Sequence, residues 1–314
     1  MTDAAIAHAA ALLRAGEVVA LPTETVYGLG ADALNPAAVA RVFALKGRPS
    51  DHPLIIHLPP EAKLDDWAAH VPPEARTLAA AFWPGPLTLI LGRGPRVPRA
   101  VTGGQDTVAL RVPDHPVALA LLRAFGSGIA APSANRYGHI SPTTAAHVRA
   151  EFGDELPLIL DGGPCRVGIE STIVDLSRGS PVVLRPGAIT ARDIQRVLGS
   201  AGAENVQGSA PRAPGLVKRH YAPRTPAELV ATAALPGRLA ELARQGLSAG
   251  VLALGSTPAA TGIALPADPG AYGRGLYAAL RELDRRGYAR LLIEAPPEDD
   301  AWQAINDRLR RAVA

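Results

Sequence analysis

Short apolar runs alternate with helically spaced apolar residues along the first two hundred residues of the chain. Eight runs are apolar or alternating and have the length of strands: 18–21, 53–56, 87–91, 107–113, 128–131, 156–160, 173–176 and 182–185. Helical spacing predicts helices in the segments between them: 36–45, 61–70, 73–82, 115–125, 143–152 and 190–198. A further amphipathic helix begins near Thr2 or Asp3. Strands that alternate with helices predict an α/β fold.

The pattern is interrupted after residue 199. Residues 199–226 are rich in Gly, Ala, Pro and Ser without periodicity, which is typical of a linker. Alternation then resumes, with expected strands at 228–230, 250–254 and 289–294 and helices at 237–245, 272–286 and 302–313. This predicts a small, Rossmann-like parallel sheet. The expected organisation is a catalytic domain at 1–200, a linker at 201–227 that closes over the active site, and a second α/β domain at 228–314.

Polar groups follow the first strand directly. The strand stops at Pro22, which cannot continue a ladder, and Thr25 and Tyr27 come next. Gly28 and Gly30 are expected to let the backbone turn sharply there. Open α/β sheets bind ligands in crevices beyond the ends of their strands, so this stretch is a candidate site.

A pair of cations follows the expected helix at 36–45. Lys46 and Arg48 are spaced to hold an anion, although basic residues at a helix end also simply complement the helix dipole. The chain has 3 lysines against 29 arginines, so a lysine at this position is mildly informative.

Other strand ends carry similar groups. The strand at 128–131 leads into Pro132 and then Ser133, which repeats the architecture of the opening stretch. Arg111 lies on the same face of its strand as Thr107, and it either lines a cleft or is a surface residue. Arg185 ends a further strand. Within the linker, Tyr221 accompanies two cations and a histidine, which indicates a segment that folds back over the cleft, the alternative being an exposed tether.

Composition narrows the class of protein. Apolar residues make up 47% and charged residues 19%, as in folded proteins, and no apolar run approaches the length of a membrane span. The start lacks the basic region of a signal peptide, so a cytoplasmic location is expected. A net charge of +3 is compatible with anionic small molecules or a weak tRNA contact.

Common catalytic motifs are missing from the sequence. The single cysteine, Cys165, excludes an internal disulfide and a cysteine-based zinc site, and we expect it to be a packed side chain. There is no Walker loop, G-x-S-x-G elbow, H-E-x-x-H or metal-ligand cluster. Cations without paired carboxylates suit a polyanionic substrate, with phosphate as the natural candidate.

Seven motifs in order carry a resemblance. They are LPTETVYGLGADA, KGRP followed by HPLIIH, TVALRVP, APSAN, SPTT, GIESTIVD and LRPGAI. Together they cover about residues 5–198 and resemble the YrdC-like family, whose fold is a twisted open α/β sheet with a cleft. The linker APGLVKRHYAP and the trailing unit resemble the long two-domain L-threonylcarbamoyladenylate synthases of that family.

The resemblance implies a reaction. ATP, L-threonine and bicarbonate would give threonylcarbamoyl-AMP and pyrophosphate, the intermediate that a tRNA threonylcarbamoyltransferase uses for N6-threonylcarbamoyladenosine. Mg²⁺ is expected to accompany ATP, with no dedicated protein metal site. Lys46 and Arg48 are the expected catalytic cations, with Arg185 also meeting the phosphate oxygens.

The resemblance also implies two groups of binding residues. Those expected at L-threonine are Thr25, His57, Arg111, Ala131 and Ser171. Those expected at ATP are Arg48, His52, Thr107, Ser133, Asn135, Ser141, Arg185 and Tyr221. His52 departs from the family pattern, which commonly has asparagine there.

Two other functions compete with this one. An RNA-binding module of the same fold is the main alternative, but such modules usually carry a higher net charge and exposed basic stripes. Carbamoyl transfer for hydrogenase maturation is a second alternative, and the related domains there belong to larger multidomain chains.

Overall fold

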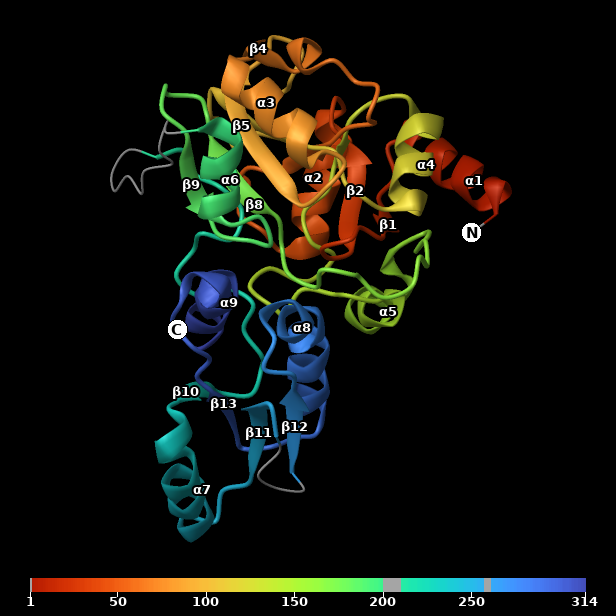
Figure 1. Cartoon of the computed structure of the whole chain (residues 1–314). Helices are drawn as coiled ribbons and strands as arrows, with labels where there is room; N and C mark the ends of the chain where they lie inside the picture. The colour runs from red at the N-terminus through yellow and green to blue at the C-terminus, as the bar shows by residue number, and fades with distance from the viewer. Residues whose placement is uncertain (1, 200–209, 257–260) are drawn as a thin grey trace.

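The computed structural model describes residues 2–199, 210–256 and 261–314. In this part of the chain the strands form two separate sheets, one between residues 19 and 185 and one between residues 227 and 294. Figure 1 shows the two sheets as two bodies, with the helices near the C-terminus lying between the second sheet and the first body.

The first sheet is mixed and has nine strands within the described residues, in the order β1-β2-β7-β3-β6-β5-β8-β9 with β4 beside β5. Its strands are β1 Val19–Leu21, β2 Gly28–Asp32, β3 Ile55–His57, β4 Ala68–His70, β5 Leu87–Arg93, β6 Thr107–Arg111, β7 Ile129–Ala130, β8 Thr172–Asp175 and β9 Val182–Arg185. The pairs β3·β6 and β5·β8 are parallel and the others are antiparallel. Strand ends from distant parts of the sequence therefore meet at one edge.

The helices of this body begin at side chains that cap them. Thr2 accepts a hydrogen bond from the amide of Ala5, Asn35 caps the second helix, and Thr190 forms a capping box with Asp193. The helices are α1 Asp3–Arg14, α2 Pro36–Lys46, α3 Pro73–Phe82, α4 Pro116–Phe125, α5 Ala145–Phe152 and α6 Ala191–Leu198. The expected helix start near Thr2 or Asp3 is confirmed, and apart from 61–70 the expected helix bounds in this body are close to those observed.

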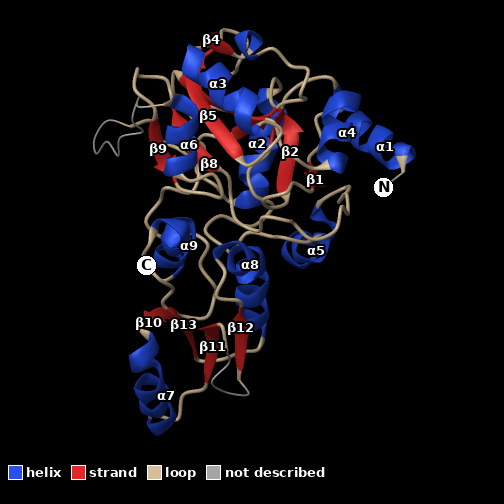
Figure 2. Ribbon diagram, in the orientation of Figure 1, coloured by secondary structure: helices blue, strands red, loops and turns tan. Residues whose placement is uncertain are grey.

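The second sheet is parallel, as the alternating pattern predicts. Its order is β10-β13-β11-β12. The elements are β10 Ala227–Val230, α7 Leu235–Arg244, β11 Ala249–Leu254, β12 Gly262–Leu265, α8 Pro269–Arg285, β13 Arg290–Glu294 and α9 Gln303–Ala312. Strand β12 is absent from the sequence-based prediction because its apolar run is very short. Figure 2 shows α8 and α9 on the side of this sheet that faces the first body.

Two sequence-based element predictions are wrong. Residues 61–70 form a short 3-10 turn and the edge strand β4 instead of a helix, because Trp67 is drawn into the core. Residues 156–160 make a single bridge, from Ile159 to Ala20, instead of a strand. Pro157 lies in that run and has no N–H to extend a ladder.

The two glycines after the first strand also have a different role from the one predicted. Gly28 and Gly30 lie inside β2, so they do not form the turn, which falls within residues 22–27. A Cβ on Gly30 would lie 2.7 Å from Leu21 Cδ2 and 2.9 Å from Ile129 Cγ2. Glycine is needed here because neighbouring side chains close over the strand.

The two bodies share an apolar cluster. Ile140 and Ile169 from the first body pack with Tyr272, Tyr277 and Leu276 of α8, which are all buried. The position of the second body against the first is therefore fixed by packed side chains around α8.

None of the helices in the described ranges has both the length and the apolar character that a membrane span requires.

Candidate functional site

One pocket at the edge of the first sheet collects most of the predicted site residues. Nine of them line it: Thr25, Arg48, His57, Arg111, Ala131, Ser133, Ser171, Arg185 and Tyr221. They come from the loop after β1, the end of α2, the ends of β3, β6 and β9, the loops after β7 and before β8, and the linker. The expected convergence of strand ends into one basic cavity is what the structure shows.

Arg111 is held by an acidic residue that sequence reasoning did not select. Its Nη2 lies 2.6 Å from Glu24 Oε1, and both side chains are almost fully buried. Its Nη1 donates to Thr25 Oγ1 at 3.0 Å, and its Nε donates to the Gly85 carbonyl at 3.2 Å. A buried arginine requires a countercharge, and the carboxylate between Thr23 and Thr25 was the nearest signal in the sequence.

His57 lies beside Arg111 on the neighbouring strand, since the two residues are register partners in β3 and β6. It is buried, and neither ring nitrogen has a hydrogen-bond partner among the described residues. Burial, and then the charge of Arg111, lower the pKa of His57 to about 3. The ring is therefore neutral near neutral pH and can both donate to and accept from a ligand.

We predict that burial of neutral histidines makes the fold acid-sensitive. Burial also lowers the pKa of His220 to about 3 and that of His147 to about 4. Below pH 6.5 the unfolded chain binds protons that the folded chain cannot, so the free energy of unfolding falls by up to about 1.4 kcal/mol per pH unit for each histidine. Urea unfolding at pH 7.5 and 5.5 measures this.

In that experiment, the free energy of unfolding of His57→Gln should fall by about 1 kcal/mol less than that of the wild type between pH 7.5 and 5.5, because one titrating group is gone. His8→Gln, at an exposed position, serves as the matched control and should lose as much as the wild type. An identical loss in all three proteins would contradict the buried neutral state of His57.

Two further guanidinium groups give the pocket its positive charge. Arg48 follows Gly47, whose left-handed backbone (φ 60°) ends α2, and its Nη2 donates to the Pro53 carbonyl at 3.0 Å. Burial lowers the pKa of Arg48 to about 10, so it stays charged at neutral pH. Arg185 donates through Nε and Nη2 to the Ser171 carbonyl at 3.0 and 2.9 Å. Buried guanidinium groups with spare donors are suited to bind phosphate.

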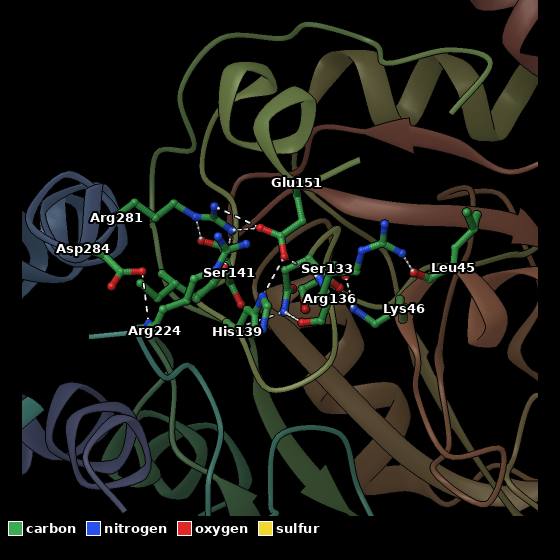
Figure 3. A network of polar contacts seen from close by, with 12 residues as sticks. Leu45, Lys46, Ser133, Arg136, His139, Ser141, Glu151, Arg224, Arg281 and Asp284 are labelled. Atoms are coloured by element: carbon green, nitrogen blue, oxygen red, sulfur yellow. Dashed lines mark hydrogen bonds and ion pairs between the residues drawn. The ribbon is translucent and has the colours of Figure 1, made fainter. Parts of the chain in front are cut away.

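Lys46 lies behind the pocket instead of lining it. Its Nζ donates to the carbonyls of Ser133 at 2.6 Å and Asn135 at 2.5 Å, and its side chain is buried. Burial and the charge of Arg48 lower the pKa of Lys46 well below its ordinary value. Figure 3 shows this ammonium group directed at the loop that follows β7. The structure thus gives Lys46 a contact with that loop that uses two of its three N–H donors, and the expected contact with phosphate stays a prediction.

Four other predicted residues lie outside the pocket lining. Thr107 and Arg111 are at opposite ends of β6, about 13 Å apart, so only a ligand as long as a nucleotide reaches both. His52 lies beside Tyr137, with Nδ1 3.3 Å from the tyrosine hydroxyl. Asn135 donates to two backbone carbonyls of its own loop, and Ser141 donates to Glu170 at 2.6 Å.

The loop 133–141 is fastened from two sides. Glu151 of α5 accepts from the Arg136 amide at 2.9 Å and contacts His139 Nδ1 at 3.0 Å. Arg281 of α8 pairs with Glu151 at 3.3 Å and donates to the Ile140 carbonyl (Figure 3). Burial alone raises the pKa of Glu151, but its hydrogen bonds and Arg281 lower it to about 2. The charged carboxylate thus orders a loop that carries three predicted nucleotide contacts, Ser133, Asn135 and Ser141.

The described part of the linker lies against the pocket. Pro214 and Tyr221 are among its lining residues, and Arg185 Nη1 donates to the Pro214 carbonyl at 2.9 Å. Tyr221 is buried in a left-handed conformation (φ 61°), and its hydroxyl has no partner among the described residues. The cavity has a volume of about 50 Å³. Small-molecule sites usually offer about 300 Å³ or more, so in this conformation the pocket is smaller than a nucleotide site.

The chain is similar to known proteins over nearly its whole length. A Sua5/YciO/YrdC family profile described as "Telomere recombination" matches residues 11–187, and one described as "Threonylcarbamoyl-AMP synthase, C-terminal domain" matches residues 189–314. The threonylcarbamoyl-AMP synthase of Pyrococcus abyssi is 43% identical, over 97% of this chain and 92% of that protein. The one from Bacillus subtilis is 43% identical, over 99% of this chain and 93% of the relative.

A solved structure shares the whole arrangement. The crystal structure of P. abyssi Sua5 complexed with L-threonine matches with a TM-score of 0.94 and 41% identity, over 100% of this chain and 95% of that one. The likeness covers both bodies and the segment between them.

Proposed function

The chain belongs to the Sua5/YciO/YrdC family of threonylcarbamoyl-AMP synthases, and we propose that it forms threonylcarbamoyl-AMP and pyrophosphate from ATP, L-threonine and bicarbonate. It is a nucleotidyltransferase-type enzyme of tRNA processing. The observation that carries the choice of substrates is one pocket that holds Arg48, Arg111 and Arg185 together with hydroxyl groups and a neutral histidine.

L-Threonine is proposed to bind at Arg111. Guanidinium pairs bidentately with carboxylate, and the Arg111 donors at present contact Glu24 and Thr25. Each of the two Nη groups has a second N–H that these contacts leave available, so the substrate carboxylate would bind there while Glu24 keeps its pairing. The neutral ring of His57 and the hydroxyl of Ser171 are available for the amino and hydroxyl groups of the substrate.

ATP is proposed to place its phosphates at Arg48 and Arg185. The threonine nitrogen, once deprotonated, would attack CO₂ derived from bicarbonate, and a carbamate oxygen would then attack the α-phosphorus. The bond from that phosphorus to the leaving pyrophosphate breaks, and negative charge builds on the phosphate oxygens. Positioned guanidinium groups stabilise that charge without reorganisation, because the fold already holds them in place.

Mg²⁺ is proposed to arrive with ATP. Within the described ranges no group of three or more His, Cys, Asp or Glu side chains is placed to hold a metal ion. The carboxylate among the pocket-lining residues, Glu170, is already paired with Arg308. These side chains therefore fit a metal ion that the oxygens of the triphosphate hold. Such an ion would shield the charge of the phosphates.

The linker is proposed to open for ATP and to close over it. Closure would place the free hydroxyl of Tyr221 and the carbonyl of Pro214 at the pocket wall and would exclude water from the mixed anhydride.

We propose that the product passes to a tRNA threonylcarbamoyltransferase, with at most a weak tRNA contact. Because tRNA is modified where it is made and used, a cytoplasmic location follows from the proposal.

Pyrophosphate release from ATP tests the function directly. We expect release only when L-threonine and bicarbonate are both present, in an assay that runs each of the twenty amino acids with and without bicarbonate. Mass spectrometry should find threonylcarbamoyl-AMP. Pyrophosphate release that does not depend on threonine would contradict the synthase. Binding of RNA without any pyrophosphate release would favour the RNA-binding module.

A further inference from the structure

Glu170 is a charged residue of the pocket that has no role in the proposed reaction steps. It precedes Ser171, lines the pocket, and is only 7% exposed. Its Oε1 accepts the hydroxyl of Ser141 at 2.6 Å. Its Oε2 accepts the hydroxyl of Tyr277 at 2.9 Å and Nε of Arg308 at 3.0 Å. Both carboxylate oxygens are thus fixed, one by the first body and one by the second.

Arg308 of α9 reaches Glu170 from the second body and is completely buried. Besides its bond to the carboxylate, its Nη2 donates to the Glu170 carbonyl at 3.1 Å and its Nη1 to the Pro186 carbonyl at 2.7 Å. The guanidinium carbon lies 5.6 Å from the centroid of the Tyr221 ring, and this ring stacks on Tyr277 at 5.7 Å. One arginine therefore touches the pocket carboxylate and the linker tyrosine together.

The charges around Glu170 come from every segment packed against it. The groups that face it are Arg308 and Tyr277 from the second body, Arg185 from β9, His220 and Tyr221 from the linker, and Ser141 from the loop before α5. Burial by itself raises the pKa of Glu170, but Arg308, Arg185 and the hydrogen bonds outweigh it and hold the pKa below its ordinary value. The carboxylate is therefore charged and would repel a triphosphate if it lost its partners.

We propose that Arg308 is a positioning residue of the nucleotide site, which acts by neutralising and orienting Glu170, so that the second body completes the ATP pocket of the first. The inference rests on the proposed function, because it takes the pocket to be the ATP site. Arg308 touches no expected substrate atom. It sets the position of the Glu170 carboxylate, and through it the Ser141 hydroxyl, while its ring contact supports Tyr221.

A second contact between the bodies supports this arrangement. Arg281 of α8 pairs with Glu151, which orders the loop from Ser133 to Ser141 (Figure 3). Arginines of α8 and α9 thus hold one buried carboxylate each, and each carboxylate holds a segment that carries a predicted ATP contact. Figure 1 shows both helices placed against the first body.

The test measures ATP binding by calorimetry in the intact chain without threonine, at pH 8 and pH 6. Arg308→Met should weaken binding about tenfold relative to wild type at pH 8, where the unpaired carboxylate is charged. At pH 6 the loss should shrink to about threefold, because the carboxylate without its countercharge begins to take up a proton. In turnover, KM for ATP should rise more than kcat falls.

Matched variants separate positioning from folding. Arg310→Met removes an exposed arginine of the same helix and should bind ATP like wild type at both pH values. Glu170→Gln added to Arg308→Met should make the loss of affinity relative to wild type equal at pH 8 and pH 6, since Glu170 is the carboxylate that lines the pocket and Asp307, the other partner of Arg308, lies outside the lining. If Arg308→Met does not fold, Tyr277→Phe removes one hydrogen bond to Glu170 and should weaken ATP binding about threefold.

Two results would overturn the inference. If folded Arg308→Met or Tyr277→Phe binds ATP as tightly as Arg310→Met, Arg308 is not a positioning residue, while the proposed function is unaffected. If the wild-type protein binds no ATP, both the positioning role and the proposed function are wrong.

Discussion

Replacement of Arg111 by methionine is expected to raise KM for L-threonine about a hundredfold, with a much smaller effect on KM for ATP. A bidentate, charge-assisted pair in a buried site contributes about 3 kcal/mol, which corresponds to that factor. The structure adds a second effect. Glu24 lies 2.6 Å from Arg111 and would be left as an unpaired buried charge. The variant should therefore also lose about 3–5 kcal/mol of stability.

The two effects of Arg111 are separable with a second substitution. Glu24→Gln in the Arg111→Met background should restore much of the stability, because no buried charge remains, and should leave threonine affinity low. Initial rates over a range of threonine concentrations, together with urea unfolding, measure both quantities. Arg99→Met, which removes an exposed arginine paired with Asp106, is the control. An unchanged KM for threonine in folded Arg111→Met would show that the carboxylate binds elsewhere.

The site was predictable where its residues end strands. Arg111, Ser133 and Arg185 were selected because each follows an apolar run, and the sheet brings these ends into one pocket. The strand order that does so, with β3 between β7 and β6, joins segments far apart in the sequence. Local pattern cannot supply that order, and the family resemblance supplied only the expectation of a twisted open sheet with a cleft.

The parts that were not predictable depend on partners distant in sequence. Glu24 gains its meaning only from Arg111, and Glu170 from Arg308, which is 138 residues away. Nothing local in the sequence reveals that Lys46 donates to carbonyls of the loop after β7, since these carbonyls lie about ninety residues further along the chain. Gly30 was taken for a turn residue because the sequence does not show Leu21 and Ile129 closing over it.

The contrast between Lys46 and Arg48 gives the second large effect. Arg48→Met is expected to lower kcat by about 10²–10³, the usual loss when one donor to a developing negative charge is removed. Its effect on KM for L-threonine should be small. The Arg48 guanidinium lines the pocket and donates to the Pro53 carbonyl, and within the described residues it forms no hydrogen bond with Thr25 or Arg111, which are expected to bind the threonine substrate. Single-turnover rates of pyrophosphate release at saturating substrates measure the chemical step.

Lys46→Met should behave differently from Arg48→Met, although the two residues were predicted to act alike. The carbonyls of Ser133 and Asn135 would lose their buried donor, at a cost of about 1–3 kcal/mol in stability. Part of the nucleotide loop would loosen, so KM for ATP should rise while kcat falls less than in Arg48→Met. Because the ammonium reaches the pocket only through that loop, a loss of kcat in Lys46→Met equal to that in Arg48→Met, with unchanged stability, would mean that Lys46 turns toward phosphate during the reaction.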